Sequence, residues 1–156
     1  MPSVSERDNA LVWAARFGQP EAIVILVKNG AGPNVRWGMN DWAVLMHAIH
    51  KDQLRALLAL LNNGANVDLA GGHGDTPLIM PIGYRYTDIV RILLEHGANA
   101  HATLPSGENA LDRAISGVAD LDRFTYGSCQ SDTVRVLRQS VPNLRPKDSG
   151  NLKRCS

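Results

Sequence analysis

Two stretches decide the fold of this chain: Gly74-Asp75-Thr76-Pro77-Leu78, and the closing Leu93-Leu94-Glu95-His96-Gly97-Ala98-Asn99. Within the closing stretch, Gly97-Ala98-Asn99 repeats Gly64-Ala65-Asn66, which itself aligns with Gly30-Ala31-Gly32. The motif therefore recurs at a period of about 33 residues, which is typical of architectures in which small units stack to bury a continuous core. The sequence predicts an all-α repeat solenoid.

Each repeat contains two short apolar segments at helical spacing and ends at a glycine. In the first repeat these segments are Leu11–Ala15 and Ile23–Val27, and Gly30 ends the second helix because glycine adopts positive φ without steric cost. The same pair recurs as 43–50 with 54–61, 76–83 with 88–94, and 110–116 with 132–139. The stretches between repeats, 30–41, 64–75 and 97–108, are rich in turn-forming residues, so we expect extended, β-hairpin-like fingers there.

The fourth repeat contains extra residues. Its second helix is identified by Asp132-Thr133-Val134-Arg135-Val136-Leu137, which mirrors Asp88-Ile89-Val90-Arg91-Ile92-Leu93. The separation between Asp88 and Asp132 exceeds the repeat period by about 11 residues. The sequence therefore predicts an inserted loop at about 119–131, and long insertions in compact repeats are often functional.

These motifs resemble the ankyrin-repeat family. Thr76-Pro77-Leu78, Ile89–Leu94 and Gly97-Ala98-Asn99 are similar to its turn, second helix and closing turn. The other three repeats lack the family's usual Thr-Pro, and Pro81 interrupts a first helix. The resemblance implies helix-turn-helix units in an ankyrin domain over 9–140. The expected divisions are a cap over 1–8, repeats over 9–37, 38–70, 71–103 and 104–140, and a flexible tail over 141–156.

Equivalent positions in the repeats predict the core. Leu11, Leu45, Leu78 and Leu111 occupy one such position, and Leu26, Leu60 and Leu93 occupy another. We expect both rows to be buried by stacking of neighbouring repeats. In the last helix Arg135, Arg138 and Gln139 alternate with apolar residues, as in a solvent-facing cap.

The family resemblance also implies a binding surface, because ankyrin-repeat proteins usually bind partners on the concave face made by finger tips and first helices. Transferred to this chain, that expectation selects one contiguous set of candidate partner-binding residues. They are Arg16, Phe17, Trp37, Met39, Asn40, Trp42, His50, Lys51, His73, Asp75, Tyr84, Ser106 and Glu108.

Trp37, Met39 and Trp42 are unusual in one finger, because only 5% of the chain is aromatic. Tryptophan is enriched among the residues that dominate binding energy. The alternative is that an indole folds back and covers the stack of repeats. Both interpretations stay open at this point.

Composition limits the function classes. Lys and Arg number 16 against 15 Asp and Glu, so a net charge of +1 provides no overall field to attract nucleic acid or an anionic membrane. The first residues contain no apolar signal segment, and the two cysteines, Cys129 and Cys155, suggest neither a disulfide framework nor a zinc cluster. We expect a cytoplasmic protein with a free thiol at Cys129, no cofactor and no bound metal.

The favoured interpretation is a non-enzymatic, scaffold-like module that binds a protein or peptide and is monomeric. One alternative is an enzyme or small-ligand-binding protein that uses Arg123, Phe124 and Tyr126 of the inserted loop. A second is self-association through Val24 and Leu58, which occupy equivalent positions on second helices and are expected to be exposed.

Overall fold

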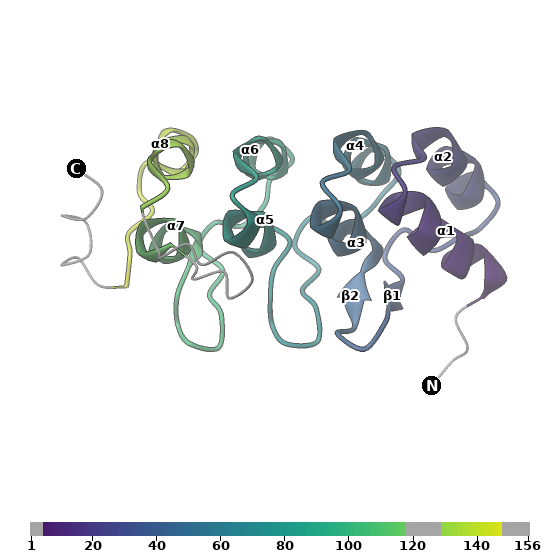
Figure 1. Cartoon of the computed structure of the whole chain (residues 1–156), viewed down its shortest axis with the longest axis horizontal. Coiled ribbons are helices and arrows are strands. Elements are labelled where there is room, and N and C mark those ends of the chain that lie inside the picture. The colour runs from purple at the N-terminus through teal and green to yellow at the C-terminus, as the bar shows by residue number, and fades with distance from the viewer. Residues whose placement is uncertain (1–4, 118–128, 148–156) are drawn as a thin grey trace. The chain divides into compact units, whose positions relative to one another are not determined.

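A computed structural model describes residues 5–117 and 129–147 (Figure 1). The chain divides into two compact units, the first ending at Pro77 and the second beginning at Leu78. Both units are built from pairs of short helices, which agrees with the predicted all-α repeat fold. None of the helices in the described residues has the length and apolar character needed to cross a membrane.

The first unit holds two helix pairs: α1 (Glu6–Arg16) with α2 (Pro20–Lys28), and α3 (Val44–His50) with α4 (Leu54–Asn62). Helix α1 packs beside α3, and α2 packs beside α4, so the first helices form one layer and the second helices another (Figure 1). The sequence places a polar residue, Ser5, at the start of α1, where its hydroxyl accepts the N–H of Asp8.

The first finger is a β-hairpin. Strand β1 (Arg36–Trp37) pairs antiparallel with β2 (Trp42–Ala43), and Trp37 lies opposite Trp42. Gly38 and Asp41 both have positive φ, which the tight reversal between the strands requires. The second finger follows α4 and runs beside the first, because the N–H of Gly72 donates to the carbonyl of Asn40 at 3.0 Å.

The second unit repeats the arrangement with α5 (Ile79–Tyr84), α6 (Thr87–Glu95), α7 (Ala110–Ser116) and α8 (Ser131–Ser140). Helix α5 packs against α7, and α6 packs against α8. Helix α5 begins at Ile79, later than the predicted start at residue 76. Pro81 has no N–H with which to bond the carbonyl of residue 77, which favours this late start.

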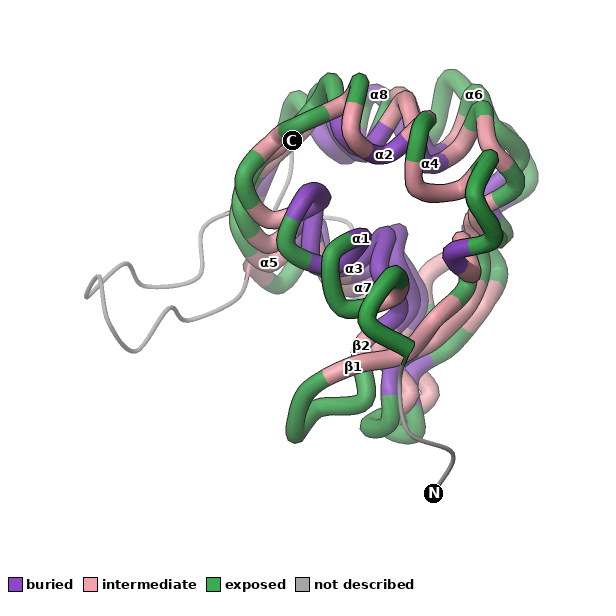
Figure 2. The backbone as a smooth tube through the Cα atoms, turned by 90° about the vertical axis from the view of Figure 1, so that its right-hand side faces the viewer, coloured by how far each residue is buried: buried purple, intermediate pink, exposed green. Residues whose placement is uncertain are grey.

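Both predicted core rows are buried except at one position. Leu11, Leu45, Leu78, Leu111, Leu60 and Leu93 are all at most 1% exposed. Leu26 is only half-buried, so its assignment to the core is wrong; Ile23 is the fully buried residue of α2 instead. In the first unit the buried residues face the space between the two helix layers (Figure 2).

The segment after α8 packs against α7 as far as Lys147. Leu144 is buried, and the side-chain amide of Asn109 donates to the carbonyl of Arg145 at 2.7 Å. The N–H of Lys147 donates to Oδ1 of Asp112 at 2.8 Å. Residues 141–147, which were expected to belong to a flexible tail, therefore pack against the N-terminal end of α7.

Candidate partner-binding surface

Aromatic side chains from α1 and the first finger meet in the first unit. The rings of Trp13 in α1 and Phe17, the residue that caps its C-terminal end, stack with their centroids 5.6 Å apart. Trp13 also meets Trp37 of β1 edge-on at 6.1 Å. The first helix and the first finger thereby share one set of aromatic contacts.

The α3 helix adds two histidines to this set. His47 lies edge-on to both Trp37 and Trp42, with centroids 5.8 Å and 5.7 Å away. The ring of His50 lies 5.2 Å from that of Trp42. We refer to Trp13, Phe17, Trp37, Trp42, His47 and His50 together as the aromatic surface.

His47 is buried, and its hydrogen bonds select one tautomer. Nε2 lies 3.2 Å from the carbonyl oxygen of Trp37, which can only accept. Nδ1 lies 3.3 Å from Nη1 of Arg16, which can only donate. His47 is therefore neutral, with its proton on Nε2 and its Nδ1 accepting from Arg16.

The surroundings of both histidines disfavour protonation. Burial lowers the pKa of His47 from its ordinary value, and the charges of Arg16 and His50 lower it further against the opposing hydrogen bond to Trp37. Burial also lowers the pKa of His50, together with the charges of Lys51 and Arg16. Arg16 thus lowers the pKa of both rings.

Several rings of the aromatic surface remain open to solvent. Phe17 is 65% exposed and Trp13 is 46% exposed, whereas Trp37 and Trp42 are half-buried. Trp42 also packs on the second finger, since a Cβ added to Gly71 would lie 2.9 Å from its Cδ1. Trp37 and Trp42 therefore pack against other residues, while part of each side chain remains exposed to solvent.

The remaining candidates of the first unit lie on its fingers and on the turn after α3. Met39, at the tip of the first finger, is fully exposed. Asn40, Lys51 and His73 are exposed, and Asp75 is half-buried. The carbonyls of Asn40 and Asp75 accept hydrogen bonds from Gly72 and Gly71, so both residues also help to hold the second finger.

Three candidates belong to the second unit. Tyr84 ends α5, is 38% exposed and lies 5.5 Å from the ring of Tyr86. The hydroxyl of Ser106 donates to the carboxylate of Glu108, which is also 3.6 Å from Arg113. Ser106 and Glu108 therefore already have polar partners within their own finger and helix.

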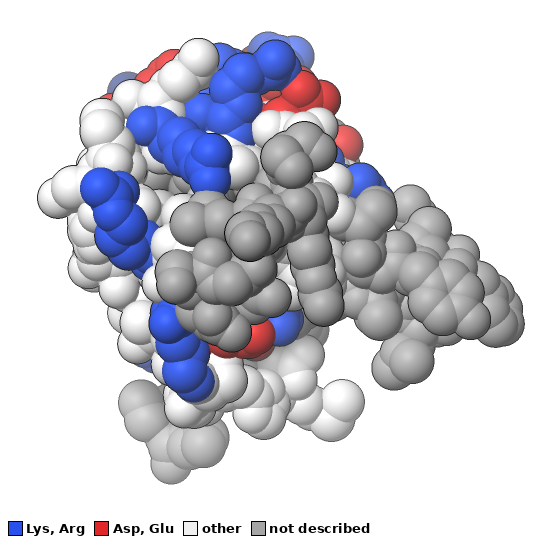
Figure 3. All heavy atoms as spheres, turned by 90° about the vertical axis from the view of Figure 1, so that its left-hand side faces the viewer, with Lys and Arg blue, Asp and Glu red and all other residues white. Residues whose placement is uncertain are grey.

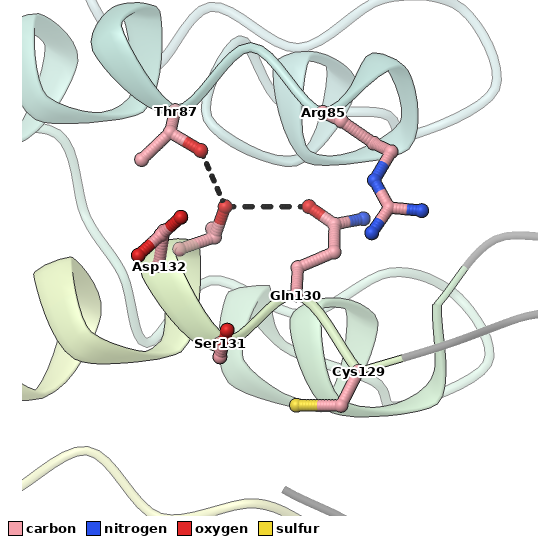
Figure 4. A pocket seen from close by; sticks show the side chains of 7 residues that line it. Arg85, Thr87, Cys129, Gln130, Ser131 and Asp132 are labelled. Carbon is pink, nitrogen blue, oxygen red and sulfur yellow. Dashed lines mark hydrogen bonds between the residues drawn. The ribbon is translucent and has the colours of Figure 1, made fainter.

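A hollow of about 190 Å³ lies in the second unit between the start of α6 and the start of α8 (Figure 4). The side-chain amide of Gln130 donates to the carbonyl of Ile82 at 2.8 Å, and its oxygen accepts from Thr133. Thr133 in turn shares a hydrogen bond with Thr87. Gln130, Thr133 and Thr87 therefore form a hydrogen-bond network that links α5, α6 and the start of α8.

Basic side chains are prominent on the described part of the C-terminal end (Figure 3). Arg135 and Arg138 of α8 are exposed, while Val134, Val136 and Leu137 face the core. Arg135 pairs with Asp132. This alternation is what the sequence predicts for a solvent-facing last helix.

A family model described as ankyrin repeats (3 copies) matches residues 3–71 and 45–144. The chain belongs to the ankyrin-repeat family. Ankyrin repeats generally mediate protein–protein interaction and are generally non-enzymatic.

Curated relatives of this ankyrin-repeat protein come from distant organisms. An ankyrin repeat-containing protein of Treponema pallidum is 30% identical over 111 residues, which are 71% of this chain and 36% of the relative. Ankyrin repeat and SOCS box protein 6 of Homo sapiens is 33% identical over 106 residues, 64% of this chain and 25% of that protein. An ankyrin repeat protein of fowlpox virus is 29% identical over 96% of this chain and 48% of its own length. The chain thus spans less than half the length of these relatives.

Trp13 and His47 of this ankyrin-repeat protein belong to the aromatic surface but were not among the predicted partner-binding residues. Trp13 lies among apolar residues of the first helix, but its four-residue spacing from Phe17 was a usable signal. His47 was not recognisable, because only the tertiary fold brings it to Trp37 and Arg16.

Two expectations concern the inserted loop. Arg123, Phe124 and Tyr126 lie outside the described residues. The expectation of a free thiol at Cys129 is wrong, because Cys129 is disulfide-bonded in this structure. A sulfur held in a disulfide is not a nucleophilic thiolate.

Proposed function

We propose that this chain is a non-catalytic interaction module whose aromatic surface binds a protein or peptide partner. One observation supports this above the others. All three tryptophans of the chain, and one of its two phenylalanines, gather on the finger and first-helix side of the first unit. Clustered, partly exposed aromatic rings are a common feature of interaction sites.

The contacts around these rings favour a preformed site. Trp37 and Trp42 lie in a paired hairpin, and both pack on buried His47. Rings held in place lose little side-chain entropy when a partner binds, so more of the contact energy appears as affinity. Met39 adds a flexible apolar side chain at the finger tip.

Further candidate residues are proposed for each unit by itself. In the first unit, Asn40, His73 and Asp75 on the fingers would add polar contacts to the aromatic surface. In the second unit, Tyr84, Ser106 and Glu108 are proposed as partner contacts.

We further propose that the protein is monomeric and cytoplasmic and acts as a scaffold. Val24 and Leu58, expected above to be exposed, are half-buried, which leaves less apolar surface on the second helices for self-association. Sedimentation over a concentration series tests the monomer.

Peptide selection tests the proposed surface while the partner is still unidentified. A displayed library of random peptides is selected on the wild-type protein, and the selected peptides are measured against Phe17→Ala and Trp13→Ala. We expect at least about a tenfold loss of affinity for the stronger of the two variants. Ile25→Ala is the matched control, because Ile25 is 61% exposed on α2 in the other helix layer.

The selection has clear outcomes. Loss of binding in Phe17→Ala or Trp13→Ala, with Ile25→Ala unchanged, supports the aromatic surface. Peptides that bind all four proteins equally well would place the binding site elsewhere and overturn the proposal.

A further inference from the structure

We propose that the partner's contact segment is acidic: a carboxylate beside an apolar side chain binds at Arg16 and Lys51, next to the aromatic surface. This inference rests on the proposed peptide-binding function and specifies the chemistry of the partner. Arg16 and Lys51 are called the basic group below.

The repeat brings the basic group together. Arg16 is the last residue of α1, and His50, one repeat later, is the last residue of α3. Phe17 and Lys51 are the C-cap residues of the same two helices. Because α1 and α3 pack side by side, these equivalent positions lie at the same end of the helix layer.

Arg16 is positioned by its neighbours and not by an anion. Its guanidinium carbon lies 5.5 Å from the centre of the Trp13 ring, and Nη1 donates to His47. A guanidinium has five N–H donors, so most of them remain for another acceptor. The geometry therefore presents a fixed, planar donor group beside exposed aromatic rings.

The first unit does not neutralise these charges. Among ion pairs of the described residues, Arg36 is bound to Asp41 and Arg55 to Glu21, whereas Arg16 and Lys51 have no carboxylate partner. Arg16 and Lys51 both lower the pKa of His50, which agrees with their closeness to one another. A carboxylate placed here would meet the cations Arg16 and Lys51, and the exposed acid nearest in sequence is Asp52 in the same turn.

Helix ends provide a competing explanation for the basic group. Cations are common at helix C-termini, where the macrodipole supplies about half a negative charge per helix. Two such ends, α1 and α3, offset about one of the two full charges on Arg16 and Lys51. The helix ends alone therefore do not cancel both cations.

Three matched peptides test the inference: acetyl-Leu-Glu-Phe-Glu-Leu-amide and its two analogues with Gln or Lys in place of both Glu residues. Binding is measured by NMR titration of the ¹⁵N-labelled full chain, following the amide signals of α1 and α3. We expect the Glu peptide to bind at least about threefold more tightly than the Gln peptide, as for one or two partly exposed ion pairs. The Lys peptide is expected to bind most weakly, and added salt should reduce the preference.

Variants locate the effect. Lys51→Gln and Arg16→Gln are each expected to reduce the preference for Glu over Gln. Lys28→Gln is the matched control, because Lys28 is an exposed cation that ends α2, outside the aromatic surface. Phe17→Ala is expected to weaken all three peptides alike. Lys51→Gln keeps the test valid if Arg16→Gln disturbs His47.

The outcomes separate this inference from the proposed function. If the Glu and Gln peptides bind the aromatic surface equally well, the surface binds peptides but the acidic preference is wrong. The same conclusion follows if the Lys peptide binds most tightly, or if Lys28→Gln removes the preference as effectively as Lys51→Gln. If none of the three peptides shifts these signals, the acidic contact is overturned, and the library selection judges the proposed function separately.

Discussion

The N–H of Gln130 donates to the carbonyl of Ala114, with 2.9 Å between nitrogen and oxygen. Gln53 and Ala48 make the same bond, also at 2.9 Å, between the two helices of the second repeat. Gln53 follows Ala48 after a short turn, whereas the insertion separates Gln130 from Ala114 in sequence. The fourth repeat therefore has the same hydrogen bond between its two helices, and its extra residues lie between the two bonded residues. The second repeat forms this hydrogen bond between its helices without an insertion, so the inserted residues are not needed for it.

Removing the insertion should leave the second unit folded. The variant lacks 118–128 and carries Cys129→Gly, which restores the pattern around Gly18, a glycine with φ of +66° at the equivalent turn. We expect the free energy of unfolding in urea to change by less than about 1 kcal/mol, because shortening a loop changes its closure entropy only slightly. Full-length Cys129→Gly is the control, since it removes the disulfide and keeps the loop. Loss of cooperative unfolding in the shortened chain alone would show that the loop contributes to the core.

Gln130→Ala should destabilise the second unit. The change removes the buried amide that bonds Ile82 and Thr133 and leaves part of their polar capacity unmet. We expect a loss of about 1–2 kcal/mol in the free energy of unfolding. Gln139→Ala, an exposed glutamine on the same helix, should change it by less than about 0.5 kcal/mol. Equal effects of the two substitutions would contradict the structural role of Gln130.

Gly71→Ala should disturb Trp42. The added methyl would lie 2.9 Å from Cδ1 of Trp42 and 3.3 Å from Cε of Met46, so the indole or the second finger has to move. We expect a loss of about 1–3 kcal/mol in stability and a change in tryptophan fluorescence. Gly72 is not a suitable control because it meets the backbone of the first finger; Ala70→Ser, at a half-buried neighbouring position, is the milder comparison. An unchanged emission spectrum in Gly71→Ala would argue against the close packing of Trp42.

Acid should weaken the first unit through His47. Its folded-state pKa is lowered below the ordinary 6.5, so the unfolded chain binds a proton more readily. This contribution to stability is complete above pH 6.5 and is lost as the pH falls below that value. His47→Gln preserves a donor for Trp37 and an acceptor for Arg16 without titrating, so its stability should fall less between pH 7 and pH 5 than that of the wild type.

Urea unfolding at several pH values measures this difference. His73→Gln, which alters an exposed histidine of the second finger, is the control and should follow the wild type. An identical pH dependence in wild type and His47→Gln would show that burial of His47 does not affect stability.

Much of the fold follows from local sequence. The predicted range 110–116 coincides with α7, and the predicted second helices at 54–61, 88–94 and 132–139 each differ from the observed bounds by one residue at one or both ends. These helices follow from apolar spacing and, for α4 and α6, from the glycine at the closing turn, which are properties of neighbouring residues. The burial of Leu26 and the start of α5 were predicted less well, because both predictions assumed that equivalent positions in all four repeats have the same structure.

The candidate surface was only partly predictable. Phe17, Trp37, Trp42 and His50 were selected from family resemblance, but the ring contacts that join them to Trp13 and His47 cross between helices and finger. The polar contacts of Ser106 and Glu108 likewise became visible only in three dimensions.

The sequence by itself determined the period, the helix pairs and the length of the insertion, because these depend on the order and spacing of residues along the chain. The tertiary structure decided which side chains meet. Stacking α1 beside α3 places Arg16 on the buried Nδ1 of His47 and leaves its charge without a carboxylate among the described ion pairs. Such a juxtaposition depends on packing across 31 residues of sequence, which no local pattern encodes.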